Sequence, residues 1–225
     1  MMYWRDILFD AECPVCRRKG VRSGLCETCA GRITEAVKRE RVTLSDGEGH
    51  TLCGVSAMHR TADVERLLLY FKHNTNRALL AWCARMGLYA LSLLGLPKGT
   101  LFVSVPRSGK GYAENGFDHA ERLARAMAKM DVNGGIYAPL LCRRNASAGQ
   151  KLLTERDREK RMNGSIALSG RRLPPQIPAV VIIDDLYTAG ATLFACEKAL
   201  RTALPDTPIF FAVLARGRGG TTGED

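Results

Sequence analysis

The chain has 225 residues, of which 46% are hydrophobic, so it is long and apolar enough for one substantial domain with a small appendage. This composition excludes a chain without a folded core and predicts a globular, soluble protein. The net charge of +10 favours a polyanionic partner, which could be a phosphorylated small molecule, a nucleic acid or an acidic protein surface.

The amino terminus lacks the pattern of a signal peptide, because Met1 to Cys13 contains several charged residues and no long apolar centre. The most membrane-like stretch, Ala78 to Leu96, is interrupted by Arg85 and contains Gly87 and Gly95, which favours a buried helix. We therefore expect a cytoplasmic protein that does not insert into a membrane.

Two Cys-x-x-Cys pairs lie near the amino terminus, separated by only nine residues. Four thiolates can form the closed tetrahedral shell of a structural zinc ion, which also holds together a segment too short for a core of its own. Disulfides and an iron–sulfur cluster are the alternatives, although a chain without an export signal would seldom keep disulfides. Spacing and compartment favour a zinc site whose metal ligands are Cys13, Cys16, Cys26 and Cys29.

The other cysteines and the histidines show no metal-binding spacing. We expect four scattered cysteines to be small buried side chains: Cys53, Cys83, Cys142 and Cys196. We expect the four histidines to be packed or surface residues rather than ligands: His50, His59, His73 and His119.

A helix predicted from Ile33 to Arg41 follows the cysteines, and residues 45–49 form a turn or linker. We therefore place a zinc module with its following helix at residues 1–45 and a larger domain at residues 50–220. The larger domain opens with an edge strand predicted from Leu52 to Met58. Two helical patterns follow, from Asp63 to Lys72 and from Arg77 to Leu94.

A strand predicted from Leu101 to Val105 leads into a loop rich in glycine and cations. Glycines free the backbone to approach a ligand, and the cations supply charge that could meet a pyrophosphate. An ordinary basic turn is the alternative, but the place of the loop after a strand favours an anion site. The candidate pyrophosphate-binding residues are Arg107, Ser108, Gly109 and Lys110.

The next helix has Asp118 as its predicted N-cap and extends to Met130. Residues 143–163 then combine small polar residues with many charges. This pattern favours a mobile loop that could close over an anionic substrate, and a solvated hairpin and helix is the alternative.

The central motif runs from Val180 to Thr192. Its β-branched run predicts a strand buried on both faces of a parallel sheet, and a helical pattern follows from residue 193 to residue 204. Ligands of such sheets bind at the carboxyl ends of the strands, where Gly190, the nearby hydroxyls and the helix amino terminus favour an anion. Asp184 and Asp185 could accept hydrogen bonds from a sugar diol, and Mg²⁺ bound through substrate phosphates would offset their charge.

Two alternatives compete with this ligand-binding interpretation. The first is a buried strand that ends in a capping pair of acids before a helix. The second is the Walker B strand of a nucleotide hydrolase. The hydrolase would also need a P-loop, and no GxxxxGK[ST] motif occurs in the sequence.

The motif resembles the 5-phosphoribosyl-1-pyrophosphate (PRPP) loop of type I phosphoribosyltransferases. The resemblance implies an α/β fold, in which a parallel sheet is flanked by helices, and Mg²⁺ bound together with PRPP. It also implies that Asp184 and Asp185 face the ribose hydroxyls and are the catalytic residues. Tyr187 and Ala189 depart from the commonest form of the loop. The implied PRPP-binding residues are Asp184, Asp185, Thr188, Ala189, Gly190, Ala191 and Thr192.

Further motifs occur in a specific order along nearly the whole chain. They are the four-cysteine module, Phe71-Lys72, Val105-Pro106, Gly116-Phe117 with Ala120 and Leu123-Ala124, Arg144 with Gln150 and Leu153, Arg158, and the PRPP loop. Together they resemble the ComF family of competence-associated phosphoribosyltransferase-like proteins. Where that family usually has Arg-Gly-Phe-Asn, this chain has Asn115-Gly116-Phe117-Asp118, which loses a cation and gains an acid.

If the resemblance extends to activity, a nitrogen nucleophile would displace pyrophosphate from C1 of PRPP, with Mg²⁺, Arg107 and Lys110 supporting the leaving group. Purine-salvage relatives have an acid at the position of Thr188, which argues against ordinary purine-base salvage. The alternative is a non-enzymatic adaptor that binds single-stranded DNA or a helicase partner during DNA uptake, through the zinc module and the basic surface. The sequence leaves open whether the protein is an enzyme.

Overall fold

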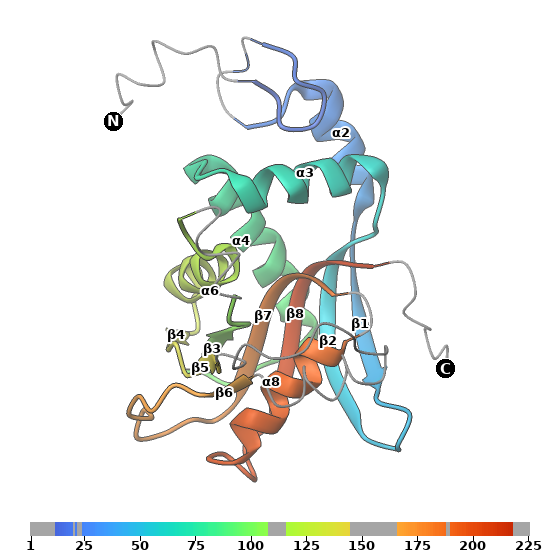
Figure 1. The fold of residues 1–225 in the computed structure, drawn as a ribbon. Coiled ribbons are helices and arrows are strands. Elements are labelled where there is room, and N and C mark those ends of the chain that lie inside the picture. Colours follow the sequence, from blue (N-terminus) through green and yellow to red (C-terminus); the bar gives the residue numbers. More distant parts are fainter. Residues whose placement is uncertain are drawn as a thin grey trace, which may run out of the picture.

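The computed structural model describes residues 12–19, 21, 24–107, 116–144, 166–187 and 190–217. These residues form an α/β fold in which a mostly parallel six-stranded sheet is flanked by helices (Figure 1). The four-cysteine segment lies beyond one end of the sheet, next to α2 and α3 (Figure 1). The predicted α/β class is therefore confirmed.

The described chain contains helices and strands along its whole length. The helices are α2 (Glu27–Ala36), α3 (Ala62–His73), α4 (Arg77–Leu91), the 3-10 helix η1 (Ser92–Leu94), α6 (His119–Met130) and α8 (Ala191–Arg201). The strands are β1 (Val37–Ser45), β2 (Thr51–Met58), β3 (Leu101–Ser104), β4 (Ile136–Tyr137), β5 (Leu141–Arg143), β6 (Ile166–Leu168), β7 (Val180–Tyr187) and β8 (Ile209–Arg216).

The large sheet has the strand order β1-β2-β8-β7-β3-β4. All neighbouring pairs are parallel except β1 and β2, which form an antiparallel edge. Strands β5 and β6 pair separately as a small antiparallel sheet. Because β7 lies between β8 and β3, its apolar run is buried on both faces, as its continuous β-branched pattern predicts.

Alternate residues of β7 belong to two hydrophobic cores on opposite faces of the sheet. Val181 and Ile183 pack in the core that includes residues of α3, α4 and α6. Val180 and Ile182 pack in the core that includes residues of α8 and the small sheet. Successive side chains from Val180 to Ile183 therefore face different layers of helices.

The structure corrects two expectations, the end of one helix and the place of one strand in the sheet. The helix predicted from Ile33 to Arg41 ends at Ala36, and Val37 to Ser45 form β1 instead. Strand β2 is not an edge strand, because β1 pairs with it on one side and β8 on the other. Strand β7 continues through both aspartates to Tyr187.

Among the described residues, one helical segment, Arg77–Leu94, is long and apolar enough to cross a membrane by length and composition alone. Core helices of soluble proteins pass the same test. Several residues of α4, including Leu79, Cys83 and Gly87, are buried, and the helix packs against α6 and the sheet. This packing agrees with the buried helix predicted from the sequence.

The expectation of burial for the scattered cysteines holds for two of them. Cys83 and Cys196 are buried, and Cys142 is half-buried. Cys53 is exposed, which contradicts the expectation, because it lies near the amino end of β2, where Thr51 on the same face is exposed too. Its sulfur is 3.9 Å from Oγ1 of Thr43 on β1.

Candidate functional site

The two loops singled out in the sequence begin at the same edge of the sheet. Strands β3 and β7 are parallel neighbours, and Ser104 at the end of β3 is opposite Ile183, next to the aspartates of β7. A cavity of about 260 Å³ lies at this edge, and its lining includes Arg107, Arg143, Asp184, Asp185 and Thr192. The sheet topology thus brings a carboxylate pair and two guanidinium groups to one cavity.

The two aspartates have different surroundings, although they are adjacent in sequence. Asp185 is only 2% exposed, whereas Asp184 is half-buried. Because strand residues alternate between faces, the Asp185 carboxylate lies against α3 and α6, on the opposite side of β7 from the α8 core. Oδ1 of Asp184 turns back and accepts a hydrogen bond from the backbone N–H of Asp185 at 2.9 Å.

Two residues from different helices contact the Asp185 carboxylate. Nζ of Lys72, near the end of α3, lies 3.2 Å from Oδ2. Nε2 of His119, the first residue of α6, lies 3.6 Å from Oδ1, which is an electrostatic contact rather than a full hydrogen bond. Asp185 is therefore held from two sides and carries the charge that offsets the ammonium group of Lys72.

The pKa values of the two aspartates move in opposite directions. Burial and the negative charge of Asp185 raise the pKa of Asp184 well above its ordinary value. Burial also acts to raise the pKa of Asp185, but contacts with His119 and Lys72 outweigh burial and lower it. Asp184 is therefore the carboxyl group of the pair that more readily carries a proton.

The residue that begins the predicted pyrophosphate loop is held by contacts with the start of α6. The backbone N–H of Arg107 donates to Oδ2 of Asp118 at 3.2 Å, and its Nη1 donates to the carbonyl oxygen of Phe117 at 2.7 Å. Oδ1 of Asp118 accepts from the N–H of Glu121 at 3.0 Å, so the predicted N-cap is confirmed. The acid found here in place of the usual asparagine thus ties the loop to the helix.

Gly190, in the middle of the candidate phosphate loop, has a φ of +75°. A Cβ atom at this position would approach Cδ1 of Leu44 to 3.0 Å, in addition to the strain of that backbone conformation. Gly190 is followed by Ala191, the first residue of α8, and Thr192, which lines the cavity. The amino terminus of α8, whose first N–H groups have no partner within the helix, therefore lies at this end of the sheet.

Several expected site residues lie outside the described part of the chain. They are Thr188 and Ala189 of the PRPP loop, Ser108, Gly109 and Lys110 of the pyrophosphate loop, and Asn115. Most of the predicted mobile loop, residues 145–163, also lies outside it. Their roles stay predictions.

Sequence reasoning gave no role to Lys72, His119 or Arg143 in this cavity. Nε of Arg143 donates to the carbonyl oxygen of Pro106 at 2.9 Å, which joins β5 to the loop after β3. The available signals were positional, because Lys72 ends a predicted helix and His119 follows a predicted N-cap. Neither signal shows that the partner of these residues is Asp185, because that depends on the order of the strands in the sheet.

The four amino-terminal cysteines form a second site. Their sulfur atoms all lie within 4.8 Å of one another, and Sγ of Cys16 and Sγ of Cys26 are 3.6 Å apart. Sulfurs that bind one zinc ion tetrahedrally at about 2.3 Å lie roughly 3.8 Å apart. Cys13, Cys16, Cys26 and Cys29 could therefore hold a zinc ion together, as their spacing predicts.

A guanidinium group connects this cluster to the main body of the fold. Nη2 of Arg32 donates to Sγ of Cys29 at 3.2 Å, and its Nε pairs with the carboxylate of Asp63 in the first turn of α3. Donors beside metal-binding sulfurs orient the ligands and stabilise their negative charge. Arg32 thus couples the cysteine site to the helix that also supplies Lys72.

The thiols of this cluster differ in acidity. Burial acts to raise the pKa of Cys13, but backbone N–H groups and the Cys16 thiol outweigh it and lower the value to about 6. Burial and the neighbouring sulfurs raise the pKa of Cys29 to about 12. A metal ion must therefore displace protons to bind all four sulfurs.

Comparison with known proteins gives one informative match. No family model matches the chain. The chain is 32% identical over 105 residues to the competence protein ComFC of Streptococcus pneumoniae (strain ATCC BAA-255 / R6). This match supports a relation to the ComF family. It covers 45% of this chain and 42% of that protein, so the chain spans less than half the length of the relative that it matches.

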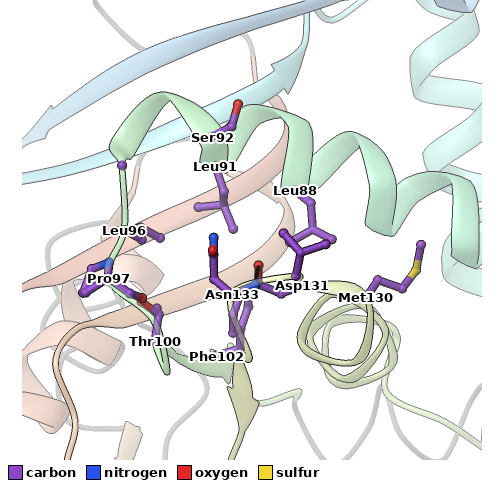
Figure 2. Close-up of a pocket in the computed structure, with 12 residues that line it drawn as sticks. Leu88, Leu91, Ser92, Leu96, Pro97, Thr100, Phe102, Met130, Asp131 and Asn133 are labelled. Atoms are coloured by element: carbon purple, nitrogen blue, oxygen red, sulfur yellow. Dashed lines mark hydrogen bonds between the residues drawn. The ribbon is translucent and has the colours of Figure 1, made fainter.

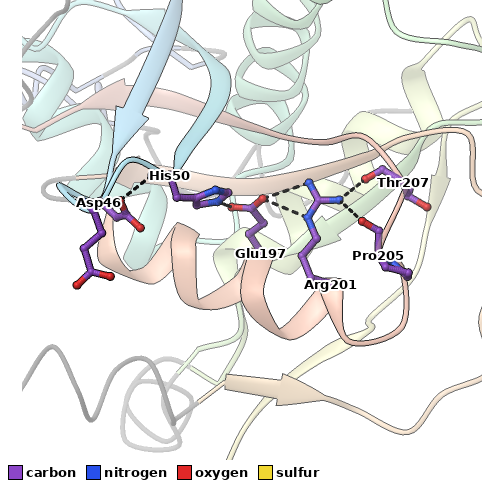
Figure 3. Close-up of polar contacts among 7 residues, drawn as sticks. Asp46, His50, Glu197, Arg201, Pro205 and Thr207 are labelled. Atoms are coloured by element: carbon purple, nitrogen blue, oxygen red, sulfur yellow. Dashed lines mark hydrogen bonds and ion pairs between the residues drawn. The ribbon is translucent and has the colours of Figure 1, made fainter.

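A buried polar cluster lies where α8 meets the β1–β2 hairpin. Glu197 of α8 is 3% exposed, and its Oε2 lies 2.8 Å from Nε2 of His50 at the start of β2. Arg201 contacts the other oxygen of Glu197 and donates to the carbonyl oxygens of Pro205 and Thr207 (Figure 3). These contacts attach the β1–β2 hairpin to α8.

A further cavity, of about 330 Å³, lies at the opposite end of β3 from the candidate site. Leu88, Leu91 and Met130 approach it from α4 and α6, and Thr100 and Phe102 approach it from the sheet (Figure 2). The hydroxyl of Thr100 already donates to the carbonyl oxygen of Pro97, and Asp131 accepts from backbone N–H groups. Thr100 and Asp131 are thus satisfied by the fold, and we assign the cavity no ligand.

Proposed function

We propose that this protein binds PRPP, or another phosphorylated ribose, together with Mg²⁺ at the carboxyl ends of β3 and β7, and that it is a competence-associated protein of the ComF type. The observation that carries the proposal is the convergence of Asp184, Asp185, Arg107 and the amino terminus of α8 on one cavity. The resemblance of residues 180–192 to a PRPP loop and the match to ComFC support the same assignment.

Each part of the cavity suits one part of such a ligand. The carboxylates can accept hydrogen bonds from the two hydroxyls of a ribose diol, whereas a fully ionised phosphate group has no hydrogen to donate to them. The residues from Thr188 to Thr192 would offer hydroxyls and N–H groups to the 5′-phosphate, together with the start of α8. Arg107, with Ser108, Gly109 and Lys110, would contact the pyrophosphate. Mg²⁺ would be held through the phosphates of the ligand, which are its usual ligands in such sites.

A transferase reaction would use the same arrangement. A nitrogen nucleophile would attack C1 of the ribose while the C1–O bond to pyrophosphate breaks, and the cations would stabilise the departing charge. Mg²⁺ would supply further charge neutralisation on the pyrophosphate. The acceptor would be a nitrogen compound other than an ordinary purine base, because Thr188 stands where purine-salvage enzymes have an acid.

Titration calorimetry with PRPP and Mg²⁺ tests the proposal. Asp184→Asn combined with Asp185→Asn should weaken binding roughly a hundredfold or more, because each lost charge-assisted hydrogen bond is worth about 1.5–3 kcal/mol. Gly190→Val should also weaken binding, by blocking close approach of the phosphate to the backbone. Asp206→Asn is the matched control, since Asp206 is exposed and outside the cavity. Wild-type protein that binds no PRPP would refute the site.

Turnover is tested separately. Release of pyrophosphate from PRPP, measured with a panel of nucleobases and amines, should appear with one acceptor class and disappear in the double aspartate variant. Binding without release for every acceptor would assign a binding module rather than a transferase.

A second candidate function is binding of single-stranded DNA at the zinc module. A hollow of about 530 Å³ lies between this module and α3, and exposed Arg17 and Arg66 line it beside Tyr70. Arg17 lies over the Tyr70 ring, 5.7 Å from its centroid. Such binding should be sequence-tolerant and should weaken steeply with salt. Arg17→Gln with Arg66→Gln should reduce the salt slope, and an unchanged slope would exclude this surface.

A further inference from the structure

The contacts of Asp185 point to a division of roles within the carboxylate pair. Asp185 is 2% exposed, and Lys72 Nζ and His119 Nε2 lie 3.2 Å and 3.6 Å from its two oxygens. Both partners come from helices on one side of the sheet, α3 and α6. Each oxygen thus lies near a partner residue, but Oδ2 makes no hydrogen bond among the described residues, so Lys72 holds it by charge alone.

His119 has few other polar options in the described structure. Its side chain is 13% exposed, and its buried Nδ1 has no hydrogen-bond partner among the described residues. The edge of its ring packs against Phe71 of α3, with 6.5 Å between the ring centroids. Packing and Asp185 therefore determine the orientation of the imidazole.

Asp184 differs from Asp185 in exposure and in partners. Both aspartates line the cavity, but Asp184 is half-buried, and its Oδ1 accepts only the backbone hydrogen bond from Asp185 among the contacts described. Its second oxygen can therefore accept a hydrogen bond from a ligand without breaking an ion pair. A ligand that engaged Asp185 would have to compete with Lys72 for a desolvated carboxylate, which is costly.

We propose that Lys72 and His119 are positioning residues. They hold Asp185 on the side of β7 that α3 and α6 cover, so that Asp184 is the carboxylate that meets the hydroxyls of the ligand. This inference rests on the proposed function, because it assumes that a phosphorylated ribose enters the cavity. It differs from the expectation that the two aspartates share one role. Lys72, although cationic and lining the cavity, acts through Asp185 rather than on a phosphate.

A double-mutant cycle separates these two roles of Lys72. Lys72→Met should lower the affinity for PRPP with Mg²⁺ about tenfold, because an unpaired Asp185 is free to turn further into the cavity that it already lines. In the Asp185→Asn background, Lys72→Met should change the affinity less than about twofold. Lys72→Arg, which keeps the charge, should restore most of the affinity. A tenfold effect of Lys72→Met in both backgrounds would overturn the proposal, because it would mean direct contact with the anion.

The contact between Asp184 and the ribose hydroxyls can be measured separately, by comparing a ligand that has the 2-hydroxyl with one that lacks it. Wild-type protein should bind ribose 5-phosphate more tightly than 2-deoxyribose 5-phosphate. Asp184→Asn should remove this preference, whereas Asp185→Asn and His119→Gln should lower both affinities and keep it. A preference that depends on Asp185 and survives Asp184→Asn would also overturn the proposal.

Failure of the proposed function gives a different pattern. Wild-type protein that binds neither PRPP nor ribose 5-phosphate would refute the function, and with it the ligand role of Asp184. If no ligand binds, the interaction between Lys72 and Asp185 can still be measured. Urea unfolding of the four proteins of the double-mutant cycle gives its contribution to the free energy of unfolding. Non-additive unfolding free energies show the hold, and additive ones contradict it.

Discussion

Nζ of Lys72 lies 3.2 Å from Oδ2 of Asp185, so the end of α3 is joined to a buried carboxylate near the carboxyl end of a central strand. Removing one partner of a buried ion pair costs about 3–5 kcal/mol, because the other charge is left uncompensated. Lys72 keeps a 31% exposed side chain, so we expect Lys72→Met to lower the free energy of unfolding by less, about 2–3 kcal/mol.

Urea unfolding monitored by circular dichroism measures this cost. Lys98→Met is the control, because Lys98 is exposed and lies in a turn outside the cavity. Equal stability of Lys72→Met and Lys98→Met would mean that the ion pair contributes nothing.

The pH dependence of stability should reveal Asp184. A carboxyl group with a raised pKa in the folded state binds its proton more tightly there than in the unfolded state. It therefore stabilises the fold fully below its ordinary pKa, and this contribution is lost as the pH rises through the raised value. The lowered pKa of Asp185 acts in the opposite way, with a contribution that is lost as the pH falls through the lowered value.

Asp184→Asn should consequently remove the loss of folding stability that wild-type protein undergoes as the pH rises through the raised pKa. The free energy of unfolding of the variant, relative to wild type, should increase between pH 4 and pH 8 in the absence of ligand. Unfolding curves at several pH values measure the difference. A difference that is constant with pH would contradict the raised pKa.

Zinc binding should need all four amino-terminal cysteines and should weaken as the pH falls. Protons compete with the metal for the thiolates, and the high pKa of Cys29, about 12, means that binding releases protons at neutral pH. Elemental analysis should find one zinc ion per chain, and none after Cys26→Ser with Cys29→Ser. Cys53→Ser is the control, because Cys53 is exposed and outside the cluster. Iron in place of zinc would overturn the assignment.

The buried Glu197 should contribute to stability through His50 and Arg201. Glu197→Ala leaves both partners without their carboxylate and removes the contact between α8 and the β1–β2 hairpin. We expect a loss of about 1–3 kcal/mol, typical of hydrogen bonds to charged groups. Thermal unfolding measures the loss. Glu48→Gln, in the exposed turn before β2, should be neutral.

The close contact between β2 and β8 should make Gly54 intolerant of a side chain. A Cβ atom at this position would lie 2.4 Å from the ring and the backbone oxygen of Phe211, and backbone cannot move aside as a side-chain end can. Gly54→Val should therefore destabilise the protein by at least about 1–3 kcal/mol. Gly47→Val tests a glycine with open space around it, where only backbone strain at a φ of +80° opposes the change.

The sequence by itself determined the features that depend on neighbours along the chain. Cys13, Cys16, Cys26 and Cys29 come together because a short segment with two Cys-x-x-Cys pairs cannot place them far apart. The apolar run of β7 reads as a strand covered on both faces, and Asp118 reads as an N-cap, because the hydrogen bonds of a cap involve only the next few residues.

Only the tertiary structure decided the features that depend on pairing between distant segments. Residues 37–45 contain lysine, arginine and glutamate, which favour a helix locally, yet they form an edge strand because β2 supplies the hydrogen bonds and only Val42 and Leu44 need burial. The roles of Lys72 and His119 have the same origin. Each is one charged or polar residue at a helix end, and its partner Asp185 is defined by the order of strands and by the face of β7 on which its side chain lies.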